Sequence, residues 1–395
     1  MAASDRSIVS SCGIRSKNCY RSPVTPKASQ FSKFADVLET RIRRGDYAIR
    51  ELPTEHELAS EIGASRTTAR WILQQLVTKG VVKRKPHGRL EINHRHERLR
   101  NRLQIAFLAP AFPSRNYALW HYALNQLASR HRAMIRAVEY VHWDDPIILE
   151  TLNGFDGVFL FLSSDPVPAL MMDRFRRASH LVILEENLSD RGLLSLQALP
   201  PFFIHRLCDH LYQLGHRRID CLNTQPPGKL IQDRIDQWLL WCRAHQVPGR
   251  LIDEPVQSYV DPVPQAYKVI QRLLAAGDLN STALLCITND AASGAIRAIH
   301  ERGLQTGKDI SVCAVDGANA QRYSIPSRTV LVPPDPAPYL SACLDWMSKR
   351  TERWSGPLLI QPSDVTLYVG ESTGPCPAVS PAASALPPKS NSSAP

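Results

Sequence analysis

The first strong pattern in the chain is a spacing of three and four residues between apolar side chains. This spacing predicts a helix over residues 31–44 and a second helix that starts at Ser65 and stops at Gly80. Between them, Thr54 and Glu57 stand three residues apart, a capping-box pattern that predicts the start of a short intervening helix. Three helices in close succession, the last two joined by a tight turn, are typical of a helix-turn-helix unit.

A short β-hairpin is predicted after the third helix. Residues 81–85 and 89–92 have strand-like patterns on either side of the turn Pro86-His87-Gly88. Together with the three helices, this hairpin predicts a winged helix-turn-helix, an architecture used to bind DNA.

Beyond the hairpin, short apolar runs alternate with helical patterns. The predicted strands are residues 103–109, 157–162, 181–185, 218–222, 283–288 and 310–315. The predicted helices are residues 116–130, 205–214, 234–245, 266–276 and 291–302. Apolar strands separated by helices predict an α/β fold with parallel sheets and helices on both faces. Sheets of this kind bind ligands at the carboxyl ends of their strands.

Composition divides the chain into five parts. We expect residues 1–29 and 374–395 to be disordered, because they are rich in Ser and Pro and lack periodicity. Residues 30–92 form the winged helix-turn-helix, residues 102–373 form the α/β domain, and the polar run 93–101 is predicted to link the two.

Charge is distributed unevenly along the chain. The 395 residues include 47 Lys and Arg against 37 Asp and Glu, a net charge of +10. The first 100 residues hold 20 basic and 10 acidic side chains, so the rest of the chain is balanced. A basic module joined to a neutral body predicts that only the N-terminal part binds a polyanion.

Other function classes lack the motifs that they require. The nine cysteines include no C-x-x-C pair, which indicates reduced thiols and no metal site. There is no G-x-S-x-G elbow, P-loop or H-E-x-x-H motif, so we expect neither catalytic residues nor a cofactor. No apolar run approaches the roughly 20 residues of a membrane span, and the N-terminus has no apolar leader, so a cytoplasmic protein is expected.

The first turn of the helix that starts at Ser65 offers side chains suited to DNA. Its apolar stripe leaves Arg66, Thr67 and Arg70 facing outward, beside backbone N–H groups that have no partner within the helix. Amides, hydroxyls and guanidinium groups bind phosphate oxygens and guanine edges in the major groove. At the tip of the hairpin, Gly88 would let the backbone approach a phosphate closely.

Two motifs in this segment resemble the GntR family. Residues 52–59 read L-P-T-E-H-E-L-A and residues 65–70 read S-R-T-T-A-R, close to that family's L-P-x-E-x-x-L-A and S-R-x-T-x-R. His56 stands where the family often has an arginine that touches DNA, and the wing residues also match. The residues predicted to contact DNA are therefore His56, Ser65, Arg66, Thr67, Thr68, Arg70, Lys85, His87, Gly88 and Arg89.

Four stretches of the long segment resemble the effector domain of the LacI/GalR family, which is built like the periplasmic sugar-binding proteins. They are residues 210–219 (H-L-Y-Q-L-G-H-R-R-I), residues 282–303 with T-N-D after a strand, residues 309–316 (D-I-S-V-C-A-V-D), and R-T-V at 328–330 together with G-E-S-T at 370–373. The resemblance implies two α/β lobes joined by three crossovers, with a small molecule bound between them.

Three ligand-binding positions of that family can be carried over. Arg234 opens a predicted helix and would fork onto hydroxyls or a carboxylate. Asn289 and Asp316 follow strands and would bind ligand hydroxyls. In the loop after the first strand, Asn116 and Tyr117 are further candidates for the pocket.

Other positions have a structural role or depart from the family. Asp290 is predicted to cap the helix that follows it. Residues 196–201 replace the usual Asp and Gly, and Gly370 replaces the closing Arg of R-x-S-T. These departures leave the ligand class open, either a common sugar or another metabolite.

The sequence therefore predicts a DNA-binding transcriptional regulator, a repressor, that works as a homodimer. Its partners would be a double-stranded DNA operator and a sugar-like small-molecule effector, with no membrane. The alternatives are a cytoplasmic small-molecule-binding protein with a degenerate or non-sugar pocket, an enzyme fused to a DNA-binding head, and a solute receptor of a transport system, which would require export.

Overall fold

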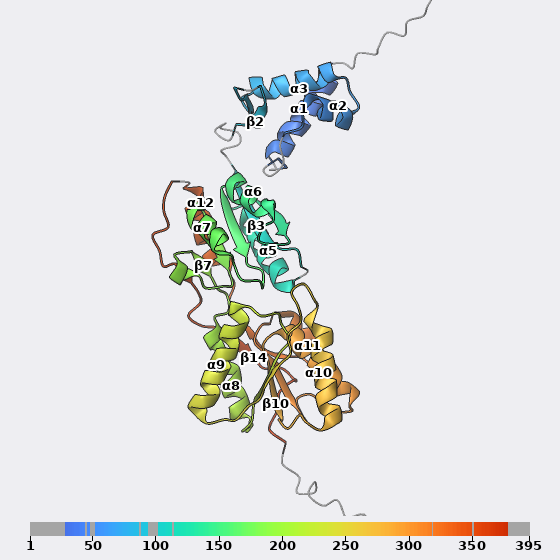
Figure 1. Cartoon of the computed structure of the whole chain (residues 1–395), viewed down its shortest axis with the longest axis vertical. Helices are drawn as coiled ribbons and strands as arrows, with labels where there is room; N and C mark the ends of the chain where they lie inside the picture. Colours follow the sequence, from blue (N-terminus) through green and yellow to red (C-terminus); the bar gives the residue numbers. More distant parts are fainter. Residues whose placement is uncertain are drawn as a thin grey trace, which may run out of the picture. The chain divides into compact units, whose positions relative to one another are not determined.

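The computed structural model divides the chain into two compact units (Figure 1). The first unit contains the first helix, to Ile42, together with the segment from Leu52 through the hairpin. The second unit contains the chain from the first long strand onward. The residues described are 28–43, 46–47, 52–86, 88–93, 102–112, 114–317, 319–349 and 351–377. The predictions for residues 1–27, for residues 94–101 of the linker and for residues 378–395 lie outside them. None of the described helices is long and apolar enough to cross a membrane.

The N-terminal unit is a three-helix cluster with a hairpin. Its elements are α1 (Ala28–Arg43), α2 (Glu55–Ile62), α3 (Arg66–Thr78), β1 (Val82–Arg84) and β2 (Leu90–Ile92). The two strands pair antiparallel. Their shared core is apolar and comprises Ala35, Leu38, Ile42, Leu58, Ala59, Ala69, Ile72, Leu73, Leu76, Val81 and Val82. The predicted winged helix-turn-helix is confirmed.

Local interactions define both ends of α2, the second of which leads into the turn before α3. The predicted capping box is present, because the Thr54 hydroxyl accepts from the Glu57 amide and the Glu57 carboxylate accepts from the Thr54 amide. Helix α2 ends at Gly63, whose φ of 63° is a left-handed conformation that glycine adopts at little cost. This turn therefore sets the direction in which α3 leaves it.

The second unit contains two six-stranded sheets with helices on both faces, and each sheet with its helices is one lobe. The first lobe has the strand order β13-β7-β6-β5-β3-β4 and the second has β14-β12-β11-β10-β8-β9. All of the pairings are parallel except that of β14 with β12. This confirms the predicted α/β fold with parallel sheets.

The first lobe consists of β3 (Leu103–Pro110), α5 (Arg115–Ala128), β4 (Ala133–Tyr140), α6 (Pro146–Gly154), β5 (Gly157–Phe161), α7 (Ala169–Arg177), β6 (Leu181–Leu184), β7 (Ser195–Leu196), α12 (Ala337–Ser348) and β13 (Leu359–Ile360). Helices α5 and α12 pack on one face of its sheet. Helices α6 and α7 pack on the other. Because both faces are covered, the central strand β5 is buried along its whole length.

The second lobe consists of α8 (Ile204–Gln213), β8 (Asp220–Asn223), α9 (Lys229–His245), β9 (Leu251–Asp253), α10 (Pro262–Ala276), β10 (Ala283–Cys286), α11 (Asn289–Glu301), β11 (Ser311–Ala314), β12 (Thr329–Val332) and β14 (Thr366–Tyr368). Helices α8 and α9 cover one face of its sheet, and α10 and α11 cover the other (Figure 1). The chain passes between the two sheets after β7, after β12 and after β13, so three crossings join the described lobes.

Two predicted boundaries are corrected by the structure. Helix α9 begins at Lys229, so Arg234 lies in its second turn and does not open it. The helix starts earlier because Gly228 is extended and none of the five residues that follow it breaks a helix. The C-terminal tail was predicted to begin at residue 374, but the Gly374 amide donates to Ser311 and the Cys376 amide donates to Leu214. The packed part of the chain therefore extends past Gly374.

Candidate functional site

The N-terminus of α3 presents three side chains to solvent. Arg66, Thr67 and Arg70 are exposed, whereas Ala69 beside them is buried. The Ser65 hydroxyl accepts from the Thr68 amide at 3.2 Å and lies 3.0 Å from the Thr68 hydroxyl. Ser65 and Thr68 thus form the helix cap, while Arg66 and Thr67 extend from the capped end.

Ser65→Ala tests the capping role. We expect the free energy of unfolding of the N-terminal unit to fall by about 1 kcal/mol, because the Thr68 amide loses its acceptor. Ser60→Ala, at an exposed position within α2, is the control and should cost nothing, since alanine is the better helix former. Thermal unfolding of the two variants measures the difference, and equal stability would refute the assignment.

Arg70 is held by a carboxylate of the preceding helix. Its Nε and Nη2 atoms donate to Glu55 at 2.8–3.1 Å. The hydrogen bond from Arg70 lowers the pKa of Glu55, and the same contact raises the pKa of Arg70. Glu55, which the sequence analysis did not single out, therefore orients this guanidinium at the predicted DNA-binding surface.

The hairpin carries further basic residues, among them the predicted DNA contacts Lys85 and Arg89. Lys83 and Lys85 both contact the Glu91 carboxylate, at 2.7 and 2.8 Å, and these contacts lower its pKa to about 2. Gly88, with a φ of 81°, and Arg89 are exposed at the turn. The predicted contact His87 lies outside the described residues. His56 is exposed on α2.

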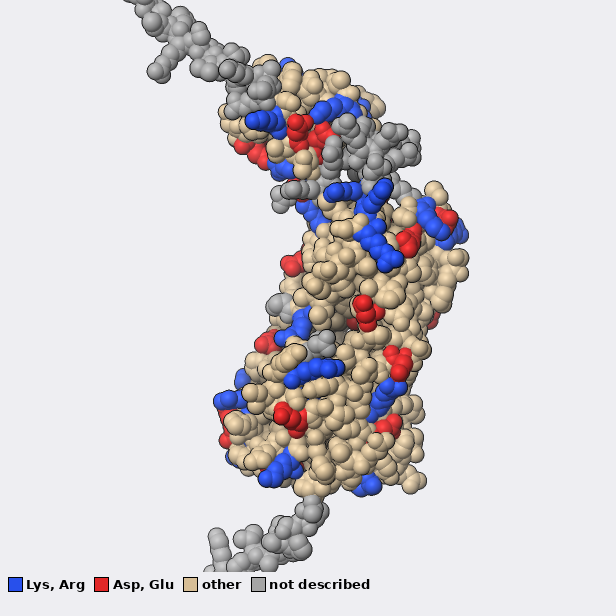
Figure 2. Space-filling view, turned by 180° about the vertical axis from the view of Figure 1, so that it is seen from behind, with Lys and Arg blue, Asp and Glu red and all other residues tan. Residues whose placement is uncertain are grey.

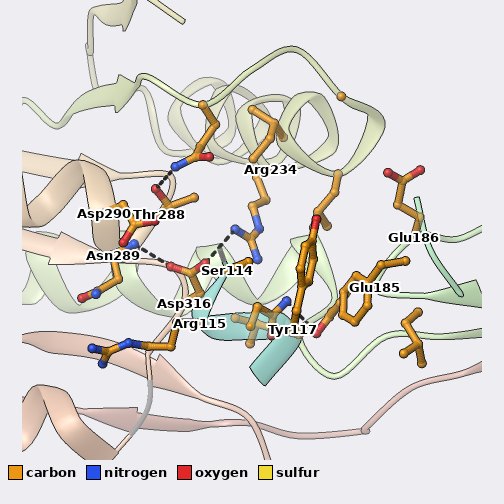
Figure 3. A pocket seen from close by; sticks show the side chains of 18 of the residues that line it. Ser114, Arg115, Tyr117, Glu185, Glu186, Arg234, Thr288, Asn289, Asp290 and Asp316 are labelled. Atoms are coloured by element: carbon orange, nitrogen blue, oxygen red, sulfur yellow. Dashed lines mark hydrogen bonds and ion pairs between the residues drawn. The ribbon is translucent and has the colours of Figure 1, made fainter. Parts of the chain in front are cut away.

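A cavity of about 270 Å³ lies between the two lobes of the second unit. The structure brings together all five predicted ligand-binding residues on its wall, Asn116 and Tyr117 from the first lobe and Arg234, Asn289 and Asp316 from the second. Figure 3 shows four of them, Tyr117, Arg234, Asn289 and Asp316. Asn116 and Tyr117 lie in the first turn of α5 and not in the preceding loop. No cluster of His, Cys, Asp and Glu that could hold a metal ion is present among the residues described.

Arg234 is the buried cation of this cavity, with 4% of its surface exposed. Its Nη1 atom donates to the Ile287 carbonyl at 3.0 Å and lies 3.5 Å from a carboxylate oxygen of Asp316. The other Asp316 oxygen accepts from the backbone amide of Asn289 at 2.6 Å (Figure 3). The buried Nε of Arg234 has no hydrogen-bond partner among the described residues, and an unmet buried donor is costly.

The start of α11 differs from its prediction. Thr288, and not Asp290, caps this helix, since the Thr288 hydroxyl accepts from the Ala291 amide. Thr288 is the N-cap residue, so Asp290 falls inside the first turn and lines the cavity. Burial and the nearby Asp316 raise the pKa of Asp290. The Asn289 side-chain oxygen accepts from Arg328 at 2.8 Å, which fixes the orientation of that amide.

Residues that the sequence analysis missed complete the first-lobe side of the cavity. Glu185, directly after β6, is 7% exposed and accepts a hydrogen bond from Trp120 at 2.8 Å. Its φ of 67° is unusual for a residue with a side chain. The Tyr117 ring lies 4.6 Å from the Phe161 ring and forms an apolar wall. The sequence signal for Glu185 was its position at the carboxyl end of a buried parallel strand.

Two family models match separate parts of the chain. Residues 32–92 match the bacterial regulatory proteins of the gntR family, and residues 208–373 match the periplasmic binding protein-like domain. The chain joins a GntR-type helix-turn-helix domain to a periplasmic-binding-protein-like domain. Both resemblances seen in the sequence are thereby confirmed.

The relatives of the chain are named as regulators. It is 26% identical over 172 residues to a probable HTH-type transcriptional repressor, ExuR, of Bacillus subtilis, covering 44% of this chain and 51% of that protein. The chain spans about half the length of the curated relatives that it matches.

Solved structures share the fold of the periplasmic-binding-protein-like domain. A LacI family transcriptional regulator from Enterococcus faecium with bound ribose superposes with a TM-score of 0.58 at 17% identity, covering 69% of this chain and 99% of that one. The Lac repressor dimer bound to operator and the anti-inducer ONPF gives a TM-score of 0.56 at 17% identity, covering 69% and 94%. At such identities the likeness establishes the fold.

The surface charge of the periplasmic-binding-protein-like domain is mixed, as the sequence suggests. On the face shown in Figure 2, basic and acidic side chains of the periplasmic-binding-protein-like domain are interspersed among a larger uncharged area. This agrees with the balanced charge of the chain beyond its first 100 residues.

The carboxyl of Glu186, which also lines the cavity, is expected to make the stability of the folded chain depend on pH. Burial raises the pKa of its carboxyl to about 7, above its ordinary 4.5, although the charge of Lys229 lowers it. Between these two values the folded chain binds the proton more tightly than the unfolded chain does. The Glu186 contribution to stability therefore falls as the pH rises from 4.5 to about 7 and is constant above that.

The difference between wild type and Glu186→Gln isolates this contribution from other buried acids. Denaturant unfolding of both proteins across this pH range is the measurement. We expect the wild type to lose more stability than the variant as the pH rises. Parallel profiles would contradict the raised pKa.

Proposed function

We propose that this chain is a transcriptional repressor whose binding to double-stranded DNA is controlled by a small molecule held between the lobes of its periplasmic-binding-protein-like domain. The observation that carries the proposal is the cavity itself. It gathers Arg234, from the second turn of α9, with Asn289 and Asp316, which follow parallel strands, and the buried Arg234 Nε has no partner among the described residues.

The GntR-type domain supplies the DNA-binding surface in this proposal. The capped N-terminus of α3 presents Arg66 and Thr67 beside backbone amides, a combination that binds phosphates and base edges. The exposed Gly88 and Arg89 of the hairpin are placed to contact the backbone nearby. The name of the ExuR relative as a repressor supports repression as the sign of the regulation.

The proposed effector is a sugar or a related hydroxylated metabolite. Arg234 and Asp316 offer a donor and an acceptor for hydroxyl groups, and the Tyr117–Phe161 wall suits the apolar face of a sugar ring. The ribose bound to the Enterococcus faecium regulator supports this class.

We further propose that two copies of the chain bind one operator as a homodimer. Two identical recognition helices read a pseudo-palindromic site, whose half-sites lie one helical turn or a multiple of it apart. The solved Lac repressor, a dimer bound to operator, supports this arrangement.

Ligand binding would act through the closure of the two lobes. On the rim of the cleft, Ser258 of the second lobe donates to Asp165 of the first at 3.1 Å, and the Tyr259 hydroxyl donates to the Val141 carbonyl. A ligand that favours this closed arrangement would change the affinity of the chain for DNA. The binding of DNA would then change the affinity for the ligand by the same factor.

Selection from random-sequence DNA duplexes with the full-length chain tests the proposal. We expect a palindromic sequence to be enriched, with an affinity that decreases as salt is raised. A sugar that stabilises the chain should then change the affinity for the selected duplex. Failure to enrich any sequence would refute the proposed function.

A further inference from the structure

Charges are distributed unequally along the cavity between the lobes. The side chains on its wall include four carboxylates, Glu185, Glu186, Asp290 and Asp316, against two guanidinium groups, those of Arg115 and Arg234. The cavity therefore holds two more acidic than basic groups. Where this excess lies determines what the ligand must carry.

The end formed by the second lobe is balanced. Asp316 lies 3.5 Å from Arg234 and also accepts the Asn289 amide. The charge of Arg115 acts on Asp290, whereas the charge of Arg234, which lies beside Asp316, also acts on Glu185 of the first lobe. The two acids of the second lobe thus have cationic neighbours.

Glu185, at the end formed by the first lobe, has only uncharged hydrogen-bond donors. Trp120 Nε1 donates to one carboxylate oxygen at 2.8 Å, and Asn116 Nδ2 lies 3.5 Å from the same atom. No described residue makes an ion pair with Glu185, although it is 93% buried. Burial raises the pKa of the Glu185 carboxyl, although the Trp120 hydrogen bond and the charge of Arg234 lower it, so a cation that a ligand brings would stabilise the charged form of this group.

The neighbouring Glu186 is in the same position. Lys229 is the cation that acts on it, but the Lys229 ammonium is bound by Asp233 at 2.8 and 3.1 Å. Asp233 also acts on Glu186 and opposes the effect of Lys229. The two carboxyl groups at the Glu185–Glu186 end of the cavity therefore both lack an ion pair with any described residue.

We propose that the effector carries a cationic amine that binds at the Glu185–Glu186 end of the cavity, with hydroxyl groups that bind Arg234 and Asp316. The inference rests on the proposed function and narrows its ligand from sugars in general to amino sugars and related hydroxylated amines. The Tyr117–Phe161 wall fits the same ligand, because aromatic faces attract both cations and the apolar face of a sugar ring. A ligand with a carboxylate at the Glu185 end would be repelled.

Thermal shift of the full-length chain against a matched panel tests this assignment. The panel contains glucosamine, galactosamine and mannosamine, their neutral parent hexoses, their N-acetyl derivatives, and glucuronate and galacturonate. We expect at least one amino sugar to raise Tm while its neutral parent and the uronates do not. Titration calorimetry then gives the affinity of the amino sugar that binds.

Glu185→Gln provides the decisive variant, because it removes the charge and keeps an oxygen to accept from Trp120. We expect the amino sugar to bind roughly tenfold to hundredfold more weakly, as for loss of a charge-assisted hydrogen bond. Affinity for the neutral parent should not fall. Glu150→Gln, which removes the same charge from the exposed face of α6, is the control and should change neither affinity.

Three results would overturn the inference. They are a neutral sugar or a uronate that binds as tightly as its amine, an amine whose affinity survives Glu185→Gln, and a panel without any binder. None of these results bears on sequence-specific DNA binding, which the duplex selection tests separately. Conversely, amine binding by a chain that enriches no duplex would sustain the ligand assignment and refute the repressor.

Discussion

Arg66→Ala will bind the selected duplex roughly tenfold to hundredfold more weakly than the wild type if the side chain reads a base. Arg66 stands at the capped end of α3, is exposed, and makes no ion pair with any described residue. Arg70 is instead tied to Glu55, so Arg66 has the guanidinium that can reach DNA without breaking a contact. Fluorescence anisotropy over a series of salt concentrations measures the effect.

The salt series also identifies what Arg66 touches. A base contact lowers affinity for the selected duplex more than for unrelated DNA, whereas a phosphate contact lowers both and makes the salt dependence shallower. Arg243→Ala, which removes an exposed arginine from the last turn of α9, is the control for net charge. Unchanged binding by Arg66→Ala at every salt concentration would remove α3 as the recognition helix.

The second large effect is expected for Arg234→Met. This change replaces the buried guanidinium with an apolar side chain of similar length and removes the unpartnered Nε. We expect the effector to bind about a hundredfold more weakly, because the hydrogen bonds of a buried charged donor are lost. Asp316 has 42% of its side chain exposed, so it stays hydrated and the fold should survive.

DNA and ligand measurements together separate this effect from misfolding. Arg234→Met should bind the selected duplex normally but no longer respond to the ligand. Arg243→Met, the same replacement at the exposed end of α9, should respond as the wild type does. A normal ligand response in Arg234→Met would show that the cavity is not the effector site.

The N-terminal domain could be predicted closely because its signals are local. The capping box of Thr54 and Glu57 and the apolar stripe of α3 act over a single turn of helix. Strands β4 and β9 were missed for the opposite reason. Both lie at the edge of a sheet, and β4 includes exposed and partly exposed positions, so neither has the uninterrupted apolar run of a central strand.

The second-lobe side of the cavity was predicted more fully than the first-lobe side. Arg234, Asn289 and Asp316 occupy motif positions, so the resemblance located them without a structure. Glu185 acquires its character from Trp120, which is 65 residues away in the sequence and meets it only in the folded lobe. That Glu185 makes no ion pair with any described residue can likewise be seen only in the folded chain.

The three crossings between the lobes have a consequence for the order of synthesis. The first lobe depends on α12 and β13, because Leu340, Leu344 and Met347 of α12 cover one face of its sheet. The ribosome makes these elements only after it has made the sheet of the second lobe through β12. The first lobe to emerge is therefore completed only after most of the second lobe has been made, and a chain truncated before α12 would expose an apolar sheet face to aggregation.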